Sequence, residues 1–186
     1  METASTPLVG HPRYARHAMV ATAHPLASQE ALAVLTQGGN AADAAIAAAL
    51  VVNVTMPAAC GLGGDAFILY YHARSRRVTG FGGSGIVPYA ASIEHYRKLG
   101  LTHLPADGIH SVSVPGAVDA YCVCRDRFGS MPLAELIAPA IRYAQEGFAM
   151  SAARRREISE VPLLRKYPSS TVIFAADSAV SGQVGD

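Results

Sequence analysis

The feature that most constrains this chain is a block of small residues that begins with Gly38–Gly39 and continues to Leu50. The two glycines stop one helix, Asn40 favours the N-cap of the next, and the helix that follows is almost wholly alanine and small aliphatic residues. Such a helix has no bulky side chains to hold its neighbours away. A glycine-rich turn at 61–64 then leads into an apolar stretch. The block therefore predicts a helix packed closely against another layer of the fold.

Composition and charge exclude several classes of protein. The chain has 186 residues, of which 51% are apolar and 16% charged, so it can bury a core and is not intrinsically disordered. Its net charge of +1, with acids and bases interspersed, argues against binding of nucleic acid or an anionic membrane. The apolar run 41–54 is shorter than the roughly 20 residues that span a bilayer. No signal-peptide pattern opens the chain, and we expect a cytoplasmic protein.

The cysteines, histidines and glycine turns indicate no metal centre or cofactor. Cys60, Cys122 and Cys124 fit no zinc motif, so we expect free, buried thiols, which suit an intracellular location. The 7 histidines form no i, i+4 pair of the kind that binds zinc on a helix. The turn at 61–64 precedes a strand and lacks a following Gly-Lys-Ser/Thr, so it is neither a P-loop nor a dinucleotide fingerprint.

Periodicity and turn residues predict a mixed order of helices and strands. Ser28 is the expected N-cap of a first helix, and the polar link 73–76 between two apolar stretches predicts an antiparallel hairpin. Beyond Pro162 the pattern weakens. The expected strands are 19–22, 65–72, 77–81 and 111–114, and the expected helices are 28–37, 41–56, 89–99, 117–128, 132–145 and 151–161.

A second glycine cluster, at 80–85, leaves a strand and ends at Pro88. Backbone so free of side chains favours close approach by a ligand, with Ser84 as a hydrogen-bond donor, or by another segment of the chain. A plain loop at the exit of a strand is the alternative, and the sequence leaves the choice open. No Gly-x-Ser-x-Gly elbow is present, and no nucleophile can be recognised.

Several linked motifs occur in a fixed order along most of the chain, at 19–28, 38–45, 61–67, 112–118, 128–129, 139–141 and 144–148. Together they resemble the start of the large subunit in the γ-glutamyltransferase (γ-glutamyltranspeptidase) family. The resemblance implies an α+β fold, an N-terminal nucleophile hydrolase-type αββα sandwich, of which this chain holds an incomplete part. Residues 1–17 are then an N-terminal extension, and 18–186 part of the large-subunit domain.

The resemblance also implies a self-cleaving precursor whose small subunit begins with a nucleophilic threonine, its own α-amine serving as base. That threonine lies beyond this chain, so no catalytic residue can be placed on it and an isolated fragment should be inactive. The implied partners are the small subunit and a γ-glutamyl or other acyl-amide substrate, with no cofactor.

One departure from the family pattern concerns the substrate. Typical members carry an Asp-x-Arg-Glu-x-Ala-Pro segment whose arginine binds the α-carboxylate of the γ-glutamyl group. Counting back from Pro88 places that arginine at Ser84 and the glutamate at Gly85. A hydroxyl cannot replace a bidentate guanidinium. The chain thus resembles the acylase-like branch of the family, and we expect amide hydrolysis or acyl transfer with a weaker preference for a free α-carboxylate.

Two alternatives stay open at this stage. Arg74, Arg76 or Arg77 could reach the same pocket from the hairpin, but they precede the strand, and we expect them to face solvent. The chain could also be a truncated, non-catalytic fragment that binds a ligand or partner. The reading frame after Asp186 distinguishes the enzyme from the fragment, because a downstream threonine at a processing site favours the enzyme.

Overall fold

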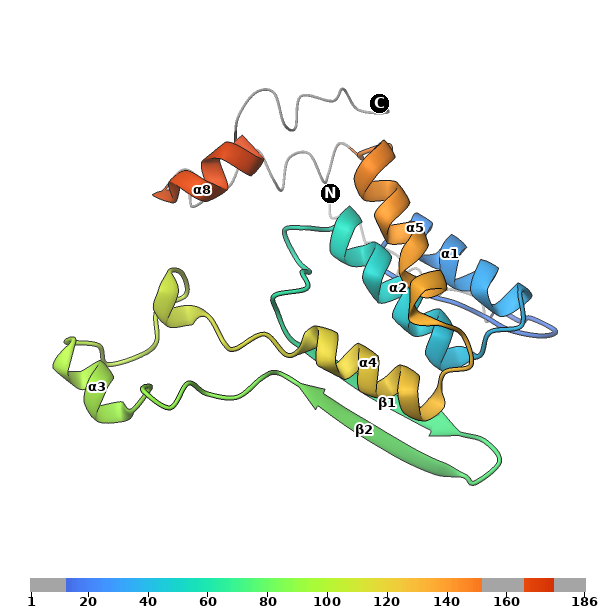
Figure 1. The fold of residues 1–186 in the computed structure, drawn as a ribbon, viewed down its shortest axis with the longest axis horizontal. Coiled ribbons are helices and arrows are strands. Elements are labelled where there is room, and N and C mark those ends of the chain that lie inside the picture. The colour runs from blue at the N-terminus through green and yellow to red at the C-terminus, as the bar shows by residue number, and fades with distance from the viewer. Residues whose placement is uncertain (1–12, 152–165, 176–186) are drawn as a thin grey trace, which may run out of the picture.

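The alanine-rich helix lies at the centre of the fold, as the sequence predicts. The computed structural model describes residues 13–151 and 166–175. In it the helix runs as α2 (Ala41–Thr55) and packs against three other helices (Figure 1), namely α1 (Pro25–Thr36), α4 (Ala117–Phe128) and α5 (Leu133–Glu146). Because α2 is built of small residues, neighbours can approach it on several sides.

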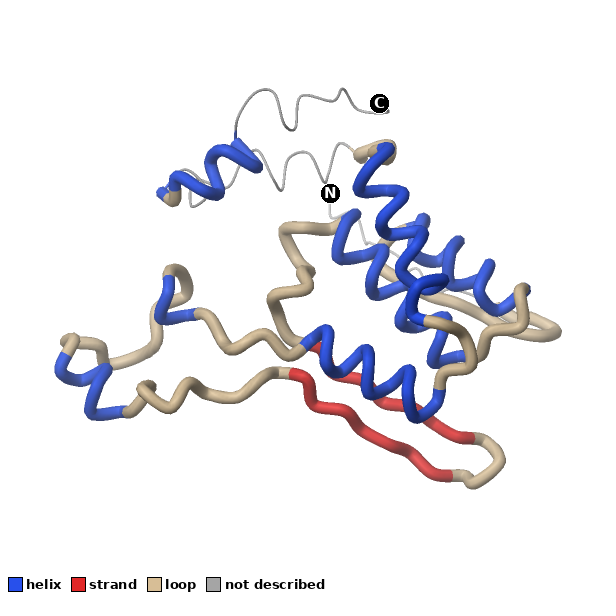
Figure 2. Tube along the Cα trace, viewed as in Figure 1, coloured by secondary structure: helices blue, strands red, loops and turns tan. Residues whose placement is uncertain are grey.

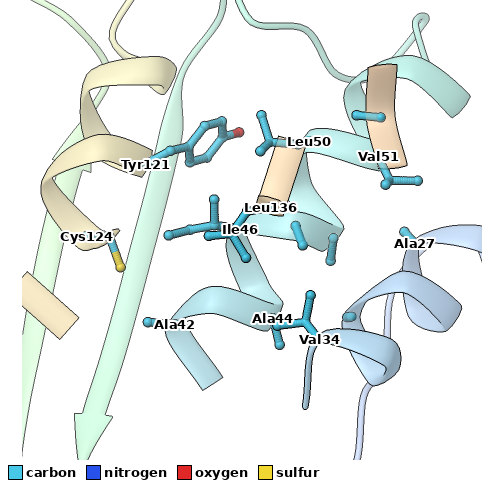
Figure 3. Packing of buried hydrophobic residues seen from close by; sticks show 14 of the residues in the cluster. Ala27, Val34, Ala42, Ala44, Ile46, Leu50, Val51, Tyr121, Cys124 and Leu136 are labelled. Carbon is cyan, nitrogen blue, oxygen red and sulfur yellow. The ribbon is translucent and has the colours of Figure 1, made fainter. Parts of the chain in front are cut away.

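The buried side chains form one cluster to which all four helices contribute (Figure 3). Ile46 and Val51 of α2 and Leu136 of α5 are fully buried in it, together with the alanines of α1 and α2. The hydrophobic core thus consists mainly of alanine side chains, with a few large residues among them. Burial of each such large side chain contributes roughly 1.5–3 kcal/mol.

The N-terminus of α2 is held by a capping box that also reaches a distant turn. Asn40 Oδ1 accepts from the backbone N–H of residues 42 and 43, and Asp43 Oδ2 accepts from Asn40 N at 2.9 Å. The fully buried Asp43 also accepts from Ser130 N, Ser130 Oγ and Met131 N, while Asn40 Nδ2 donates to the Phe128 carbonyl at 2.7 Å. The start of α2 therefore fixes the connection between α4 and α5.

The predicted hairpin is confirmed as two antiparallel strands, β1 (Ala66–His72) and β2 (Arg77–Gly83). The pairing runs from His72 opposite Arg77 to Ala66 opposite Gly83. One face lies against α4, where the Tyr70 ring stacks on Phe128 at 4.4 Å between centroids and Phe81 meets the same ring edge-on at 5.9 Å.

The other face of the hairpin is apolar and uncovered. Phe67, Leu69, Tyr71 and Val78 alternate with the inward residues, and Leu69 is 83% exposed. Within the described residues the sheet has only these two strands, so the outer edge of β1 is unpaired. A face of this kind marks a contact with further polypeptide.

Residues 84–116 form an arm that leaves β2, extends away from the helices and returns to α4 (Figures 1 and 2). The arm carries α3 (Ile93–Lys98) and one 3₁₀ turn (Ile109–Ser111). Asp107 on the arm accepts hydrogen bonds from Lys166 Nζ at 2.7 Å and Tyr167 Oη at 2.6 Å. Those residues precede the short helix α8 (Pro168–Ser170) and the π-helical turn Thr171–Ala175, which the weak pattern beyond Pro162 did not indicate.

Two predicted strands are wrong for the same physical reason. Residues 19–22 and 111–114 have strand-like composition, but neither pairs with another strand in the part of the chain that the structure describes. Val112 has extended dihedral angles, and yet the Ser113 hydroxyl bonds to the Asp65 carboxylate rather than joining a sheet. A strand requires a pairing partner that composition alone cannot supply.

Most helices are confirmed, with corrections at their starts. The first helix begins at Pro25 with His24 as N-cap, because the His24 ring accepts from Leu26 N, and Ser28 lies inside the helix. The helix expected at 89–99 is the shorter α3, since the Ser92 hydroxyl caps it. Gly129 and Gly147 end α4 and α5 as predicted. The helix expected at 151–161 lies outside the described residues, apart from Ser151.

Candidate substrate-binding site

Ser84 and Gly85, the two residues that the sequence analysis expects at the site, lie where the hairpin opens into the arm. Strand pairing ends at Ala66 opposite Gly83, so Asp65 and Ser84 are the next residues on the two chains. Both residues lie beyond the last strand pair, where the returning chain meets the hairpin: Gly116 N donates to the Gly64 carbonyl and Gly116 lies against Gly83 and Gly85. The hairpin therefore places the Asp65 carboxylate and Ser84 at the same end of the two strands.

The glycine cluster at the end of β2 is explained by close approach of another segment. A side chain on Gly83 would meet the Ala120 Cβ at 2.5 Å, and one on Gly116 would meet the Gly85 nitrogen at 2.5 Å. Gly85 has φ +68°, and a Cβ there would lie 1.7 Å from the Val114 carbonyl oxygen. The chain that exits β2 and the chain that enters α4 thus cross backbone to backbone, and no side chain at position 85 fits this path.

This crossing gives a prediction about stability. We expect Gly85→Ala to lower the free energy of unfolding by at least about 2 kcal/mol, because the new Cβ meets Val114 and the left-handed φ disfavours a side chain. Gly82→Ala is the matched control, since no heavy atom lies within 4 Å of a Cβ at that position in β2. Urea denaturation checks both, and equal midpoints for the two variants would contradict the crossing.

A cavity of about 470 Å³ lies between the hairpin end and the arm, and both Ser84 and Gly85 line it. Its other residues with polar side chains are Asp65, Ser92, Tyr96, His110, Ser111 and Ser113, and the rest of the wall is apolar and comes from the arm. Among the residues that line it there is no lysine or arginine. Its largest apolar contributors are Ile86, Val87, Ile93, Leu104 and Val112.

The hydrogen bonding in this cavity suits a partner that donates. The Ser113 hydroxyl donates to Asp65 Oδ1 at 2.9 Å, and Oδ2 has no hydrogen-bond partner among the described residues. The His110 ring is held edge-on by Tyr96, with ring centroids 5.7 Å apart. A carboxylate oxygen and a serine hydroxyl can accept from an ammonium or amide group. Nothing in the wall neutralises a substrate carboxylate.

The structure brings the two sequence-predicted residues together and adds others that the sequence reasoning missed. Asp65 and Ser113 are 48 residues apart, so no local motif links them. The signal that could have found Asp65 is the hairpin register, which places it at the same end of the two strands as Ser84. Arg74, Arg76 and Arg77 are exposed at the other end of the hairpin, as expected, and do not line the cavity.

The thiols and histidines form no cluster in the described residues, where no group of three or more His, Cys, Asp or Glu could hold a metal ion. The three cysteines are free, but only Cys124 is buried, whereas Cys60 and Cys122 are half-buried. Burial raises the pKa of the Cys124 thiol, and the nearby Asp43 carboxylate adds to the rise, so this thiol is unreactive. No described helix combines the length and apolarity needed to cross a membrane.

Comparison with solved structures defines the class of protein. The chain is a mixed α and β unit similar to Helicobacter pylori γ-glutamyltranspeptidase, with a TM-score of 0.84 and 30% identity over 95% of this chain and 51% of that one. It is also similar to a cephalosporin acylase from Bacillus halodurans, with a TM-score of 0.71 and 36% identity over 82% of this chain and 30% of that one.

The family itself follows from the sequence match. The model of the gamma-glutamyltranspeptidase family matches residues 27–185, and the chain belongs to that family. A similar curated protein is the glutathione hydrolase-like YwrD proenzyme of Bacillus subtilis, 37% identical over 158 residues. That alignment covers 84% of this chain and 30% of the relative. The chain therefore spans about a third of the length of such relatives.

Proposed function

We propose that this chain is the first part of the large subunit of an enzyme that hydrolyses an amide or transfers its acyl group. The nucleophile is a threonine at the N-terminus of a small subunit, outside this chain, with its own α-amine as base. Family membership supports this reaction class, and the matched relative's designation as a proenzyme supports cleavage into subunits. Within the chain, residues 84–85 contribute to acyl-group binding.

The observation that carries the proposal is the cavity at the hairpin end, with Ser84 where the arginine is expected and no lysine or arginine in the wall. A bidentate arginine contributes charge-assisted hydrogen bonds of roughly 1.5–3 kcal/mol each. Without it, a free α-carboxylate on the acyl group gains little from this cavity. We therefore assign the enzyme to the acylase-like branch, with an acyl donor other than a strict γ-glutamyl group.

The uncovered surface of the hairpin supports an incomplete αββα sandwich. The apolar face around Leu69 and the unpaired edge of β1 require a second sheet and further strands. A separate cavity of about 620 Å³ between α2 and β1, lined by Ala45, Ala49 and Tyr71 among others, offers space for that polypeptide. The later part of the precursor, including the small subunit, supplies these layers.

The test is to express the complete reading frame and to assay four anilides that differ only in the charges on the acyl group. γ-Glutamyl anilide has a carboxylate and an ammonium, glutaryl anilide only the carboxylate, 4-aminobutyryl anilide only the ammonium, and butyryl anilide neither. We expect kcat/KM for γ-glutamyl anilide to exceed that for 4-aminobutyryl anilide by less than about tenfold, because no arginine at position 84 binds the α-carboxylate. Turnover of γ-glutamyl anilide alone would refute the altered preference.

The same expression distinguishes the non-catalytic alternative. An enzyme of this family should separate into two subunits on a denaturing gel, with a new N-terminal threonine found by sequencing. A protein that stays as one short chain, hydrolyses none of the four anilides and still binds a ligand or partner would instead be the fragment considered above.

A further inference from the structure

One carboxylate lines the cavity that also contains Ser84. Asp65 follows the glycine turn 61–64 and lies one step beyond the last strand pair, at the same end of the hairpin as Ser84. It lines the same cavity as Ser84, and its Oδ1 is held by the Ser113 hydroxyl at 2.9 Å. One carboxylate oxygen is thus oriented by the protein, and the other remains available.

We propose that Asp65 is a specificity-determining residue that selects acyl groups carrying an ammonium or other hydrogen-bond donor and rejects those carrying a carboxylate. This inference rests on the proposed function and deepens it. An arginine at position 84 would attract a substrate carboxylate, whereas a fixed carboxylate repels it and attracts an ammonium. The departure from the family pattern then reverses the charge preference of the cavity rather than only weakening it.

Three observations support this assignment. The residues that line the cavity include no lysine or arginine, so the Asp65 charge is not neutralised there. The Arg74, Arg76 and Arg77 side chains are exposed at the far end of the hairpin. The part of the wall formed by Ile86, Val112 and their neighbours is apolar, so it carries no charge of either sign.

The experiment uses the processed enzyme from the complete reading frame and compares kcat/KM for 4-aminobutyryl and glutaryl anilides. We expect the wild type to favour the 4-aminobutyryl substrate and Asp65→Asn to lower that ratio by about fivefold, with butyryl anilide as the uncharged reference. Asp126→Asn is the matched control, because Asp126 is exposed near the other end of α4 and pairs with Arg125 at 2.6 Å. It should leave the ratio unchanged.

A second measurement, on the wild-type enzyme, tests the role of Asp65 even if the Asp65→Asn variant fails to fold. Raising the salt concentration from about 0.05 to 0.5 M should lower the same ratio, because exposed charges are screened. A wild-type preference for glutaryl anilide, or a ratio that neither Asp65→Asn nor salt changes, would overturn the role of Asp65. Absence of turnover of all four anilides would instead overturn the proposed function on which it rests.

Discussion

Replacement of Asp43 by alanine is expected to lower the free energy of unfolding by roughly 3 kcal/mol or more. Asp43 is fully buried at the first turn of α2 and accepts hydrogen bonds from Asn40, Ser130 and Met131. Truncation removes the acceptor of three part-buried backbone donors, each loss costing about 1 kcal/mol or more. It also releases the connection between α4 and α5 from the start of α2.

The effect should depend on pH in a defined direction. Burial acts to raise the pKa of Asp43, but the hydrogen bonds from Asn40, Ser130 and Met131 outweigh it and hold the pKa below the ordinary carboxyl value. A carboxylate with a lowered pKa stabilises the fold above its unfolded pKa of about 3.9 and loses that contribution as the pH falls through the folded value. The difference between wild type and Asp43→Ala should therefore be full at pH 7 and shrink below about pH 4.

Urea denaturation at pH 7 and at acid pH checks both statements, with Asp126→Ala as the control. Asp126 makes only an exposed ion pair with Arg125, so loss of its carboxylate should change the free energy of unfolding by less than about 0.5 kcal/mol. A shift for Asp43→Ala no larger than that of the control would mean that the α4–α5 connection does not depend on this carboxylate.

Only part of the hydrogen bonding of Asp43 could be predicted from the sequence. The cap formed by Asn40 and Asp43 could be predicted because both partners lie within one helical turn. The bonds to Ser130 could not, because they join positions 87 residues apart and depend on how α4 turns into α5. The sequence therefore indicates the local role of the carboxylate but not the larger tertiary one.

The candidate site follows the same rule. The hairpin is local and could be predicted, and its register places Asp65 and Ser84 at the same end of the two strands. The crossing of Gly85 with the Val114 carbonyl depends on the return of a long arm, which no periodicity encodes. The expected strand at 111–114 failed for this reason, since its residues serve the cavity and the crossing instead of a sheet. Only the side of the cavity that the hairpin forms could be predicted from the sequence.

The strongest functional prediction combines the two positions at the hairpin end. We expect the double variant Ser84→Arg/Asp65→Asn to raise kcat/KM for glutaryl anilide, relative to butyryl anilide, by at least about tenfold. A bidentate guanidinium contributes roughly 1.5–3 kcal/mol per charge-assisted hydrogen bond, and about 1.4 kcal/mol corresponds to a factor of ten. Ser84 is half-buried in the cavity wall, so an arginine there can reach the space that the substrate would occupy.

Ser84→Arg alone should give a smaller rise, because Asp65 lines the same cavity and competes for the guanidinium. The two single variants and the double variant form a cycle in which the coupling between the positions is measured directly. Ser84→Lys/Asp65→Asn is the control for charge without bidentate geometry, and we expect its kcat/KM ratio for glutaryl over butyryl anilide to lie between those of the wild type and the arginine double variant.

If the arginine double variant separates into subunits normally but gains no preference for glutaryl anilide, position 84 does not contact the acyl carboxylate. If the arginine effect is the same with Asp65 and with asparagine at position 65, the two side chains act independently, and the register alone does not set the charge preference of the cavity.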